Sequence, residues 1–207
     1  MKPAPPSTVT ASLLISASSP DDPDDLDPED NLAADRSIVT DLLQACAWWP
    51  KSAYGVPVRR VLLVSSSGGV LPDLLALEPW WGRYDVRWVA VDAPDTRELL
   101  ADQRVRWTEE LGVGRLDRVL AAVPAARSQL QQARVDLLIS AGSGVAVPWF
   151  LAARTTRVRA VWVETFNIVD RTGLAARLCA RLADHVVVQR PHLLERHRRA
   201  VNVGELW

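Results

Sequence analysis

The sequence predicts an α/β protein with a Rossmann-like, doubly wound parallel sheet. Two apolar runs, at residues 61–64 and 137–139, are each followed by a turn that contains two glycines. Short apolar runs of this kind are typical of buried parallel strands. Strand and helix patterns then alternate along the chain, which is the order that a parallel sheet with right-handed crossovers requires.

The 207 residues divide by composition into three parts. Residues 1–30 are rich in Pro, Ser and Asp, and such a segment buries too little apolar surface to offset its loss of entropy, so we expect a disordered acidic tail. Residues 31–58 hold a possible helix, which Pro50 ends, and a linker. We expect residues 59–207 to form the folded domain, and their twenty-one Lys or Arg against sixteen Asp or Glu make it mildly basic.

The first half of this domain contains three expected strands. Residues 61–65 and 86–91 are largely apolar runs long enough for buried strands, and a shorter strand is expected at 104–107. A helix follows the first strand over 71–77, where Pro72 falls in the first turn and is tolerated. A short helix over 95–101 follows the second strand, with Asp95 or Thr96 as its N-cap.

The second half contains four further expected strands, at 135–140, 159–163, 185–189 and 201–203. A long helix over 115–133 precedes them and is bent or interrupted by Pro124. Helices over 144–154, 173–182 and 191–199 separate them. The stretch 135–153 is long enough to span a membrane and carries one charge, yet its two glycines and Pro148 favour a strand, a turn and a helix.

The two glycine turns form the first candidate site, made of Ser67, Gly68 and Gly69 after the first strand and Gly142, Ser143 and Gly144 after the fourth. Backbone N–H groups at such turns, beside a helix N-terminus, suit a phosphate or another anion. Both turns should open on the edge of the sheet where doubly wound folds bind ligands. A structural explanation stays open, because paired glycines ease packing and Ser143 can serve as an N-cap.

Several other kinds of site find little support. Neither turn continues as a phosphate-binding P-loop or as the usual dinucleotide fingerprint, and we expect no cofactor. The Cys and His residues do not supply a set of four ligands, so we expect no metal. No Lys/Arg patch is interleaved with aromatic residues, which disfavours nucleic acid. Cys46 and Cys179 are far apart in sequence, which favours a reducing cytoplasm over a disulfide scaffold.

Glu164 directly follows the strand predicted at 159–163, at the edge where a ligand should bind. A carboxylate at this place can accept hydrogen bonds from a sugar hydroxyl or act as a base. It can equally cap the following loop or pair with Arg171. Both interpretations remain open from the residues alone.

Residues 171–199 carry seven arginines against Asp184 and Glu195. Leu174, Leu178 and Leu182 fall on one helical stripe, and a basic amphipathic helix of this type can contact an anionic bilayer or a lipid phosphate. The contacting residues would be Arg171, Arg177 and Arg181. The alternative is an ordinary surface helix whose leucine stripe packs in the core. The tryptophan pair at 48–49, and the pair at 80–81, which we expect in a loop, are likewise either membrane or partner anchors, or core residues.

A series of segments occurs in an order typical of one known family. They are LLVSSSGG at 62–69, PWW at 79–81, DAPD at 92–95, SAGSGVAVP at 140–148, VETF at 163–166, RLC at 177–179, AD at 183–184, VVQ at 187–189 and GELW at 204–207. Over residues 59–207 the chain resembles the asparagine-linked-glycosylation-fourteen-like family, which includes the bacterial PssD polysaccharide-biosynthesis proteins. The segment 142–148 and Glu164 are the most specific parts of the resemblance.

This resemblance implies the N-terminal half of a split GT-B glycosyltransferase of polysaccharide or lipid-linked oligosaccharide biosynthesis. A smaller partner would supply the C-terminal half with most of the UDP-sugar site, and the chain would be inactive without it. The acceptor would be a polyprenyl-pyrophosphate-linked sugar, held by the glycine turns at the inner face of the cell membrane, with Glu164 as the catalytic residue. The terminal Leu206 and Trp207 would dock on the partner. Val70 stands where the family usually has His, and the alternative is a non-catalytic scaffold that only anchors the partner.

Overall fold

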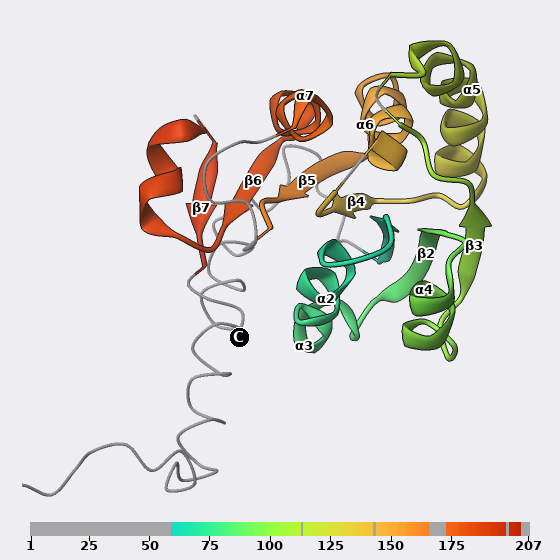
Figure 1. Cartoon of the computed structure of the whole chain (residues 1–207), viewed down its shortest axis with the longest axis horizontal. Coiled ribbons are helices and arrows are strands. Elements are labelled where there is room, and N and C mark those ends of the chain that lie inside the picture. The colour runs from blue at the N-terminus through green and yellow to red at the C-terminus, as the bar shows by residue number, and fades with distance from the viewer. Residues whose placement is uncertain (1–58, 113, 143, 166–172, 198, 204–207) are drawn as a thin grey trace, which may run out of the picture.

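One sheet of seven parallel strands organises the described part of the protein in a computed structural model (Figure 1). The structure describes residues 59–203 except 113, 143, 166–172 and 198. The predicted tail, helix and linker over 1–58 therefore lie outside the described residues, as does Trp48-Trp49. The strands in chain order are β1 (Arg60–Ser65), β2 (Asp85–Val91), β3 (Val105–Thr108), β4 (Leu137–Ser140), β5 (Arg159–Val163), β6 (His185–Val188) and β7 (Ala200–Asn202).

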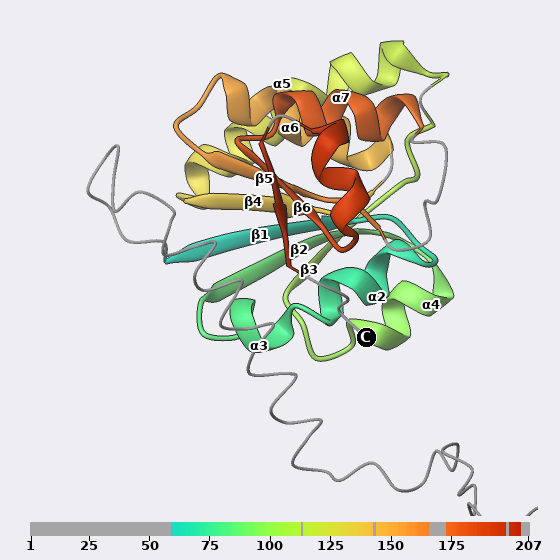
Figure 2. The same cartoon turned by 90° about the vertical axis from the view of Figure 1, so that its left-hand side faces the viewer.

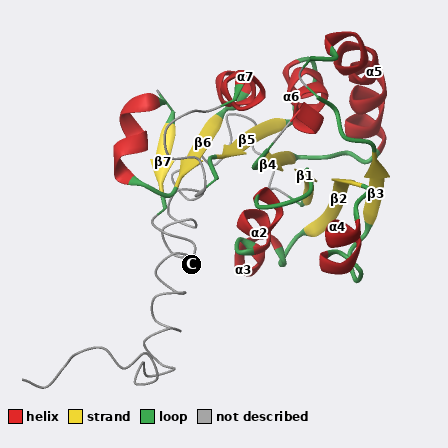
Figure 3. Ribbon diagram, in the orientation of Figure 1, coloured by secondary structure: helices red, strands yellow, loops and turns green. Residues whose placement is uncertain are grey.

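Helices cover both faces of the sheet, which confirms the predicted doubly wound fold (Figures 2 and 3). On one face lie α2 (Val70–Leu75), α3 (Glu78–Trp81) and α4 (Pro94–Leu99). On the other lie α5 (Leu116–Gln132), α6 (Val147–Arg154) and α7 (Leu174–Leu182). Two short 3₁₀ helices, η1 (Gly144–Ala146) and η2 (Pro191–Arg196), precede α6 and β7.

The strand order is β3-β2-β1-β4-β5-β6-β7, so the chain winds outward in one direction from β1 and then in the other from β4. β1 shows why its sequence is a continuous apolar run. Leu62 and Val64 belong to the core under α5 and α6, whereas Val61 and Leu63 belong to the core under α2 and α3. A strand buried on both faces has no polar side to alternate with, as expected for a parallel sheet.

Several predicted details differ from the structure. α4 starts at Pro94 with Ala93 as its N-cap, while the Thr96 hydroxyl accepts from the Ala93 N–H at 3.1 Å and donates to the Val91 carbonyl at 2.6 Å. Pro124 lies inside α5, which continues through it. The helix expected over 191–199 is a 3₁₀ helix that ends at Arg196.

Trp80 and Trp81 lie in the short helix α3 and not in a loop. Both side chains are buried, and the indole N–H of Trp81 donates to the Leu74 carbonyl at 2.7 Å. The Trp81 ring also packs edge-on against Trp88, with ring centroids 5.7 Å apart. Packing in the core, and not a membrane or partner contact, therefore accounts for Trp80 and Trp81.

The stretch 135–153 forms β4, η1 and α6, as the strand, turn and helix prediction required. Among the described residues, no helix combines the length and apolar character that crossing a membrane demands.

α7 packs its small residues inward: Ala175, Ala176 and Cys179 are buried, and burial raises the pKa of the Cys179 thiol to about 12. Leu174 and Leu178 are 71% and 38% exposed, so most of the predicted leucine stripe faces away from the core.

Gly144 permits a close approach between two parts of the backbone. A Cβ atom at this position would lie 1.7 Å from the carbonyl oxygen of Leu111, in the segment between β3 and α5. No side chain fits at such a distance, so the glycine lets this segment cross the start of η1.

We predict that Gly144→Ala lowers the free energy of unfolding by about 2 kcal/mol or more, because Leu111 must move to admit the methyl group. Gly112→Ala is the matched control, since its added Cβ meets nothing within 4 Å, and it should change stability by less than about 0.5 kcal/mol. Urea unfolding followed by circular dichroism measures both. Equal effects of the two substitutions would contradict the proposed contact.

Candidate functional site

The two glycine turns meet at one edge of the sheet, as predicted. β1 pairs directly with β4, and this is the point where the winding of the sheet reverses. In folds of this type, ligands bind outside the carboxyl ends of the strands at such a point. A Cβ atom at Gly142 would lie 2.7 Å from Cγ1 of Val70, so the residue that follows the first turn packs against the second.

A buried serine joins the ends of these two strands. The Ser140 hydroxyl donates to the Val64 carbonyl of β1 at 2.6 Å and accepts from the Gly142 N–H at 3.4 Å. The side chain is completely buried, so water does not compete for these hydrogen bonds. Ser140 therefore holds the second turn in place against the first strand.

The first turn is open to solvent and already holds an anionic group. Gly68 has a φ of +79°, a conformation that favours glycine, and Gly68 and Gly69 are exposed. The Gly68 N–H donates to Oδ2 of Asp95 at 2.9 Å. Asp95, expected only as a helix cap, thus lies where an external anion would bind. This pairing joins residues 27 apart, and local sequence patterns do not indicate it.

The second turn is covered. Gly142 and Gly144 are both buried, under Val70 and Leu111 respectively, so packing accounts for both glycines. Ser143 lies outside the described residues. Of the five predicted turn residues that the structure describes, the exposed ones therefore belong to the first turn.

Glu164 directly follows β5 at the predicted edge of the sheet, but its carboxylate is buried. Oε2 accepts from the indole N–H of Trp162 at 2.8 Å and lies 3.9 Å from Nε2 of His197. Oε1 is buried too, and it has no hydrogen-bond partner among the residues that the structure describes. Trp162 belongs to the core beneath α5, α6 and α7, so the carboxylate turns back toward that face. The alternative partner Arg171 lies outside the described residues.

A buried polar pair beside Glu164 was not predicted. The Gln189 side-chain amide donates to the Glu164 carbonyl at 3.4 Å and to Oδ1 of Asp73 at 3.5 Å. Asp73 comes from α2, directly after the first glycine turn, and both side chains are buried. The one signal in the sequence was an aspartate within the otherwise apolar helix 70–75. This pair links α2 to the ends of β5 and β6.

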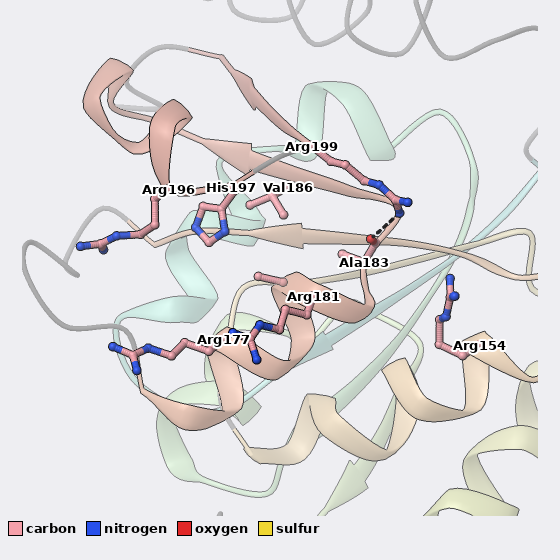
Figure 4. A pocket seen from close by; sticks show the side chains of 9 residues that line it. Arg154, Arg177, Arg181, Ala183, Val186, Arg196, His197 and Arg199 are labelled. Atoms are coloured by element: carbon pink, nitrogen blue, oxygen red, sulfur yellow. Dashed lines mark hydrogen bonds between the residues drawn. The ribbon is translucent and has the colours of Figure 1, made fainter.

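The predicted arginines lie elsewhere. Arg177 and Arg181 line an open hollow of about 890 Å³ beside α7 (Figure 4). None of the described glycine-turn residues lines it, and its lining residue His197 lies 3.9 Å from Glu164, from Nε2 to Oε2. Arg171, Leu206 and Trp207 lie outside the described residues. Within the described ranges, no group of three His, Cys, Asp or Glu side chains is placed to hold a metal.

We predict that Trp162→Phe destabilises the protein by about 1–3 kcal/mol more than Trp88→Phe, because it leaves a buried carboxylate without its donor. The two tryptophans are equally buried at 1% exposed, and the Trp88 indole N–H has no hydrogen-bond partner in the described part of the chain. Adding Glu164→Gln to Trp162→Phe should recover part of the loss, since a neutral amide is less costly to bury. Denaturant unfolding measures all three, and equal losses for the two single variants would refute the assignment.

Two kinds of curated relative are similar to the chain. The UDP-N-acetylglucosamine–N-acetylmuramyl-(pentapeptide) pyrophosphoryl-undecaprenol N-acetylglucosamine transferase of Thermobifida fusca is 36% identical over 86 residues, 42% of this chain and 22% of that protein. The transferase of the same name from Synechococcus sp. is 33% identical over 60% of this chain and 38% of its own length. The UDP-N-acetylglucosamine transferase subunit ALG14 of Eremothecium gossypii is 29% identical over 72% of this chain and 81% of its own length.

Solved structures agree on the fold. MurG from Acinetobacter baumannii superposes with a TM-score of 0.55 at 23% identity, over 64% of this chain and 42% of that one. A glycosyltransferase from Rickettsia africae superposes with a TM-score of 0.56 at 15% identity, over 72% of this chain and 43% of that one. The chain therefore spans less than half of these structures, and the likeness confirms the predicted Rossmann-like half of a GT-B fold.

The family comparison matches the part of the chain that begins at β3. The sequence profile described as "Oligosaccharide biosynthesis protein Alg14 like" matches residues 104–206, which include the second glycine turn, Glu164 and all of the hollow beside α7. The resemblance inferred from the motifs is thereby confirmed. Over this matched region the chain belongs to the Alg14-like family of oligosaccharide biosynthesis proteins.

Proposed function

We propose that the chain is the acceptor-side subunit of a two-component, UDP-sugar-dependent glycosyltransferase that acts at a membrane surface. The family match and the relatives support a glycosyltransferase-related role in oligosaccharide biosynthesis. A subunit is favoured because the alignment covers 81% of the ALG14 subunit but 38% or less of the two bacterial transferases. The donor sugar site would then lie on a smaller partner that supplies the second half of the GT-B fold.

The observation that carries this proposal is the meeting of the two glycine turns where the sheet reverses direction. The exposed amides of Gly68 and Gly69 offer hydrogen-bond donors to an anion, and the acceptor in this proposal carries one as a polyprenyl pyrophosphate. Asp95 shows that the Gly68 amide binds an oxyanion, since its carboxylate accepts that N–H. The acceptor pyrophosphate would displace this carboxylate.

Each remaining residue has a defined part in the proposal. Gly142 lets Val70, which follows the first turn, pack against the second turn, and Gly144 does the same for Leu111. Both glycines therefore have a positioning role. Glu164 is the residue expected to be catalytic, but its carboxylate is buried against Trp162, so we assign it a positioning role at the end of β5. Arg177 and Arg181 would face the anionic membrane, beside the exposed Leu174 and Leu178.

A non-catalytic scaffold is the second candidate, and two observations favour it. Asp95 already occupies the amide that an acceptor phosphate would use. Val70 stands where the family usually has His, and its side chain packs on Gly142. In this case the chain would only anchor its partner, and the first turn would be closed to ligands.

The test is co-expression of the full chain with a candidate smaller glycosyltransferase half. The purified pair is assayed with UDP-sugars and a polyprenyl-pyrophosphate-linked sugar acceptor. We predict a stable pair that transfers sugar, and no transfer by either chain alone. A stable pair without transfer would establish the scaffold instead, and failure to form a pair would contradict both.

In the active pair, we predict that Asp95→Asn lowers the KM for the acceptor about fivefold. The variant removes a carboxylate that repels the phosphate at an exposed site, an effect on the order of 1 kcal/mol. Asp102→Asn is the control, because it removes the same charge from an exposed residue outside the turn. An acceptor KM that responds equally to both substitutions would exclude the first turn as the phosphate site.

A further inference from the structure

The hollow beside α7 concentrates positive charge. Among the described residues, the lining side chains include five arginines and one histidine but no carboxylate, and they are Arg154, Arg177, Arg181, Arg196, His197 and Arg199. In Figure 4, Arg154 and Arg199 lie toward one end, and Arg177 and Arg196 lie toward the other. Three separate parts of the chain supply them: the end of α6, the outer face of α7 and the stretch from the last residue of η2 to the start of β7.

Three of these arginines are not held by carboxylates among the residues that the structure describes. Arg154, Arg177 and Arg181 form no ion pair with any residue that the structure describes. By contrast, Arg60, Arg97, Arg104 and Arg115 each pair with an aspartate. Arg177 and Arg181 are also one helical turn apart, where like charges repel each other. A cluster of this kind is stable only if its charge is dispersed by solvent or neutralised by an anion from outside.

The shape of the hollow leaves room for such an anion. The other lining residues are Ala180, Ala183 and Val186, whose short side chains do not fill the space. Arg199 is fixed in position, because its Nη1 donates to the Ala183 carbonyl at 3.4 Å. Guanidinium groups present a planar fork of N–H donors that matches phosphate oxygens in two-point hydrogen bonds.

We propose that this hollow binds a phosphate group, carried either by the headgroup of a membrane lipid or by a soluble phosphate compound. The proposal extends the membrane contact suggested above and does not depend on sugar transfer. The exposed Leu174 and Leu178 on the same helix provide apolar side chains that enter the interface when the phosphate belongs to a lipid. The site is separate from the described residues of the glycine turns, none of which lines it.

The test compares the full chain with a variant that carries both Arg154→Gln and Arg181→Gln. Neither arginine forms a hydrogen bond or ion pair with a described residue, so we expect the variant to fold, which its circular dichroism spectrum and unfolding midpoint will verify. The control carries Arg83→Gln and Arg118→Gln, which removes two exposed arginines outside the hollow. In the first arm, inorganic pyrophosphate is titrated and binding is measured by calorimetry. In the second, co-sedimentation is measured with vesicles of phosphatidylglycerol in phosphatidylcholine, and with phosphatidylcholine alone.

We expect the hollow variant to lose about tenfold or more in pyrophosphate affinity while the control keeps the affinity of the original chain. A parallel loss of binding to the phosphatidylglycerol vesicles assigns the phosphate to a lipid. Loss in the pyrophosphate arm alone assigns it to a soluble compound and contradicts the membrane contact, without affecting the test of sugar transfer. The proposal is overturned if the original chain binds neither probe, or if the hollow and control variants behave alike.

Discussion

The pairing of β1 with β4 is the constraint on which the other features of the molecule depend. It sets the point where the sheet reverses its direction of winding, and it brings residues 65–69 and 140–144 to one edge. The Ser140 hydroxyl and the contact between Val70 and Gly142 then fix the two turns against each other. The same pairing is reinforced at the opposite edge, where Oδ2 of Asp136 accepts the N–H groups of Arg59 and Arg60, each at 2.9 Å.

Much of the fold could be predicted because the strands of a buried parallel sheet appear in the sequence as nearly continuous apolar runs. Each predicted strand and helix in residues 59–203 has a counterpart in the structure, since strands such as β1 are buried on both faces and have only apolar residues in their central positions, 61–64. The predictions that were wrong concern details that depend on tertiary contacts. Trp80 and Trp81 form a helix because the core under α2 accepts both rings, and Leu174 and Leu178 face outward because smaller residues pack beneath α7.

The site was predictable to a lesser degree. The sequence indicated which segments end at the ligand edge, and it placed Glu164 there correctly. It did not indicate the Gly68–Asp95 hydrogen bond, the approach of Gln189 to Asp73, or the burial of the Glu164 carboxylate. These contacts join residues from separate elements, and in the last case a side chain turns back from the edge toward Trp162. The arginine hollow is similar, because three elements that are separate in sequence line it.

In the proposed function, the first glycine turn holds the acceptor phosphate. The most direct measurement records backbone amide chemical shifts while a water-soluble, short-chain polyprenyl-pyrophosphate sugar is titrated into the full chain. We predict the largest shifts at the amides of the exposed residues Gly68 and Gly69, as the Asp95 carboxylate is displaced. Shifts confined to the arginine hollow, or unchanged amides at both glycines under saturating ligand, would contradict it.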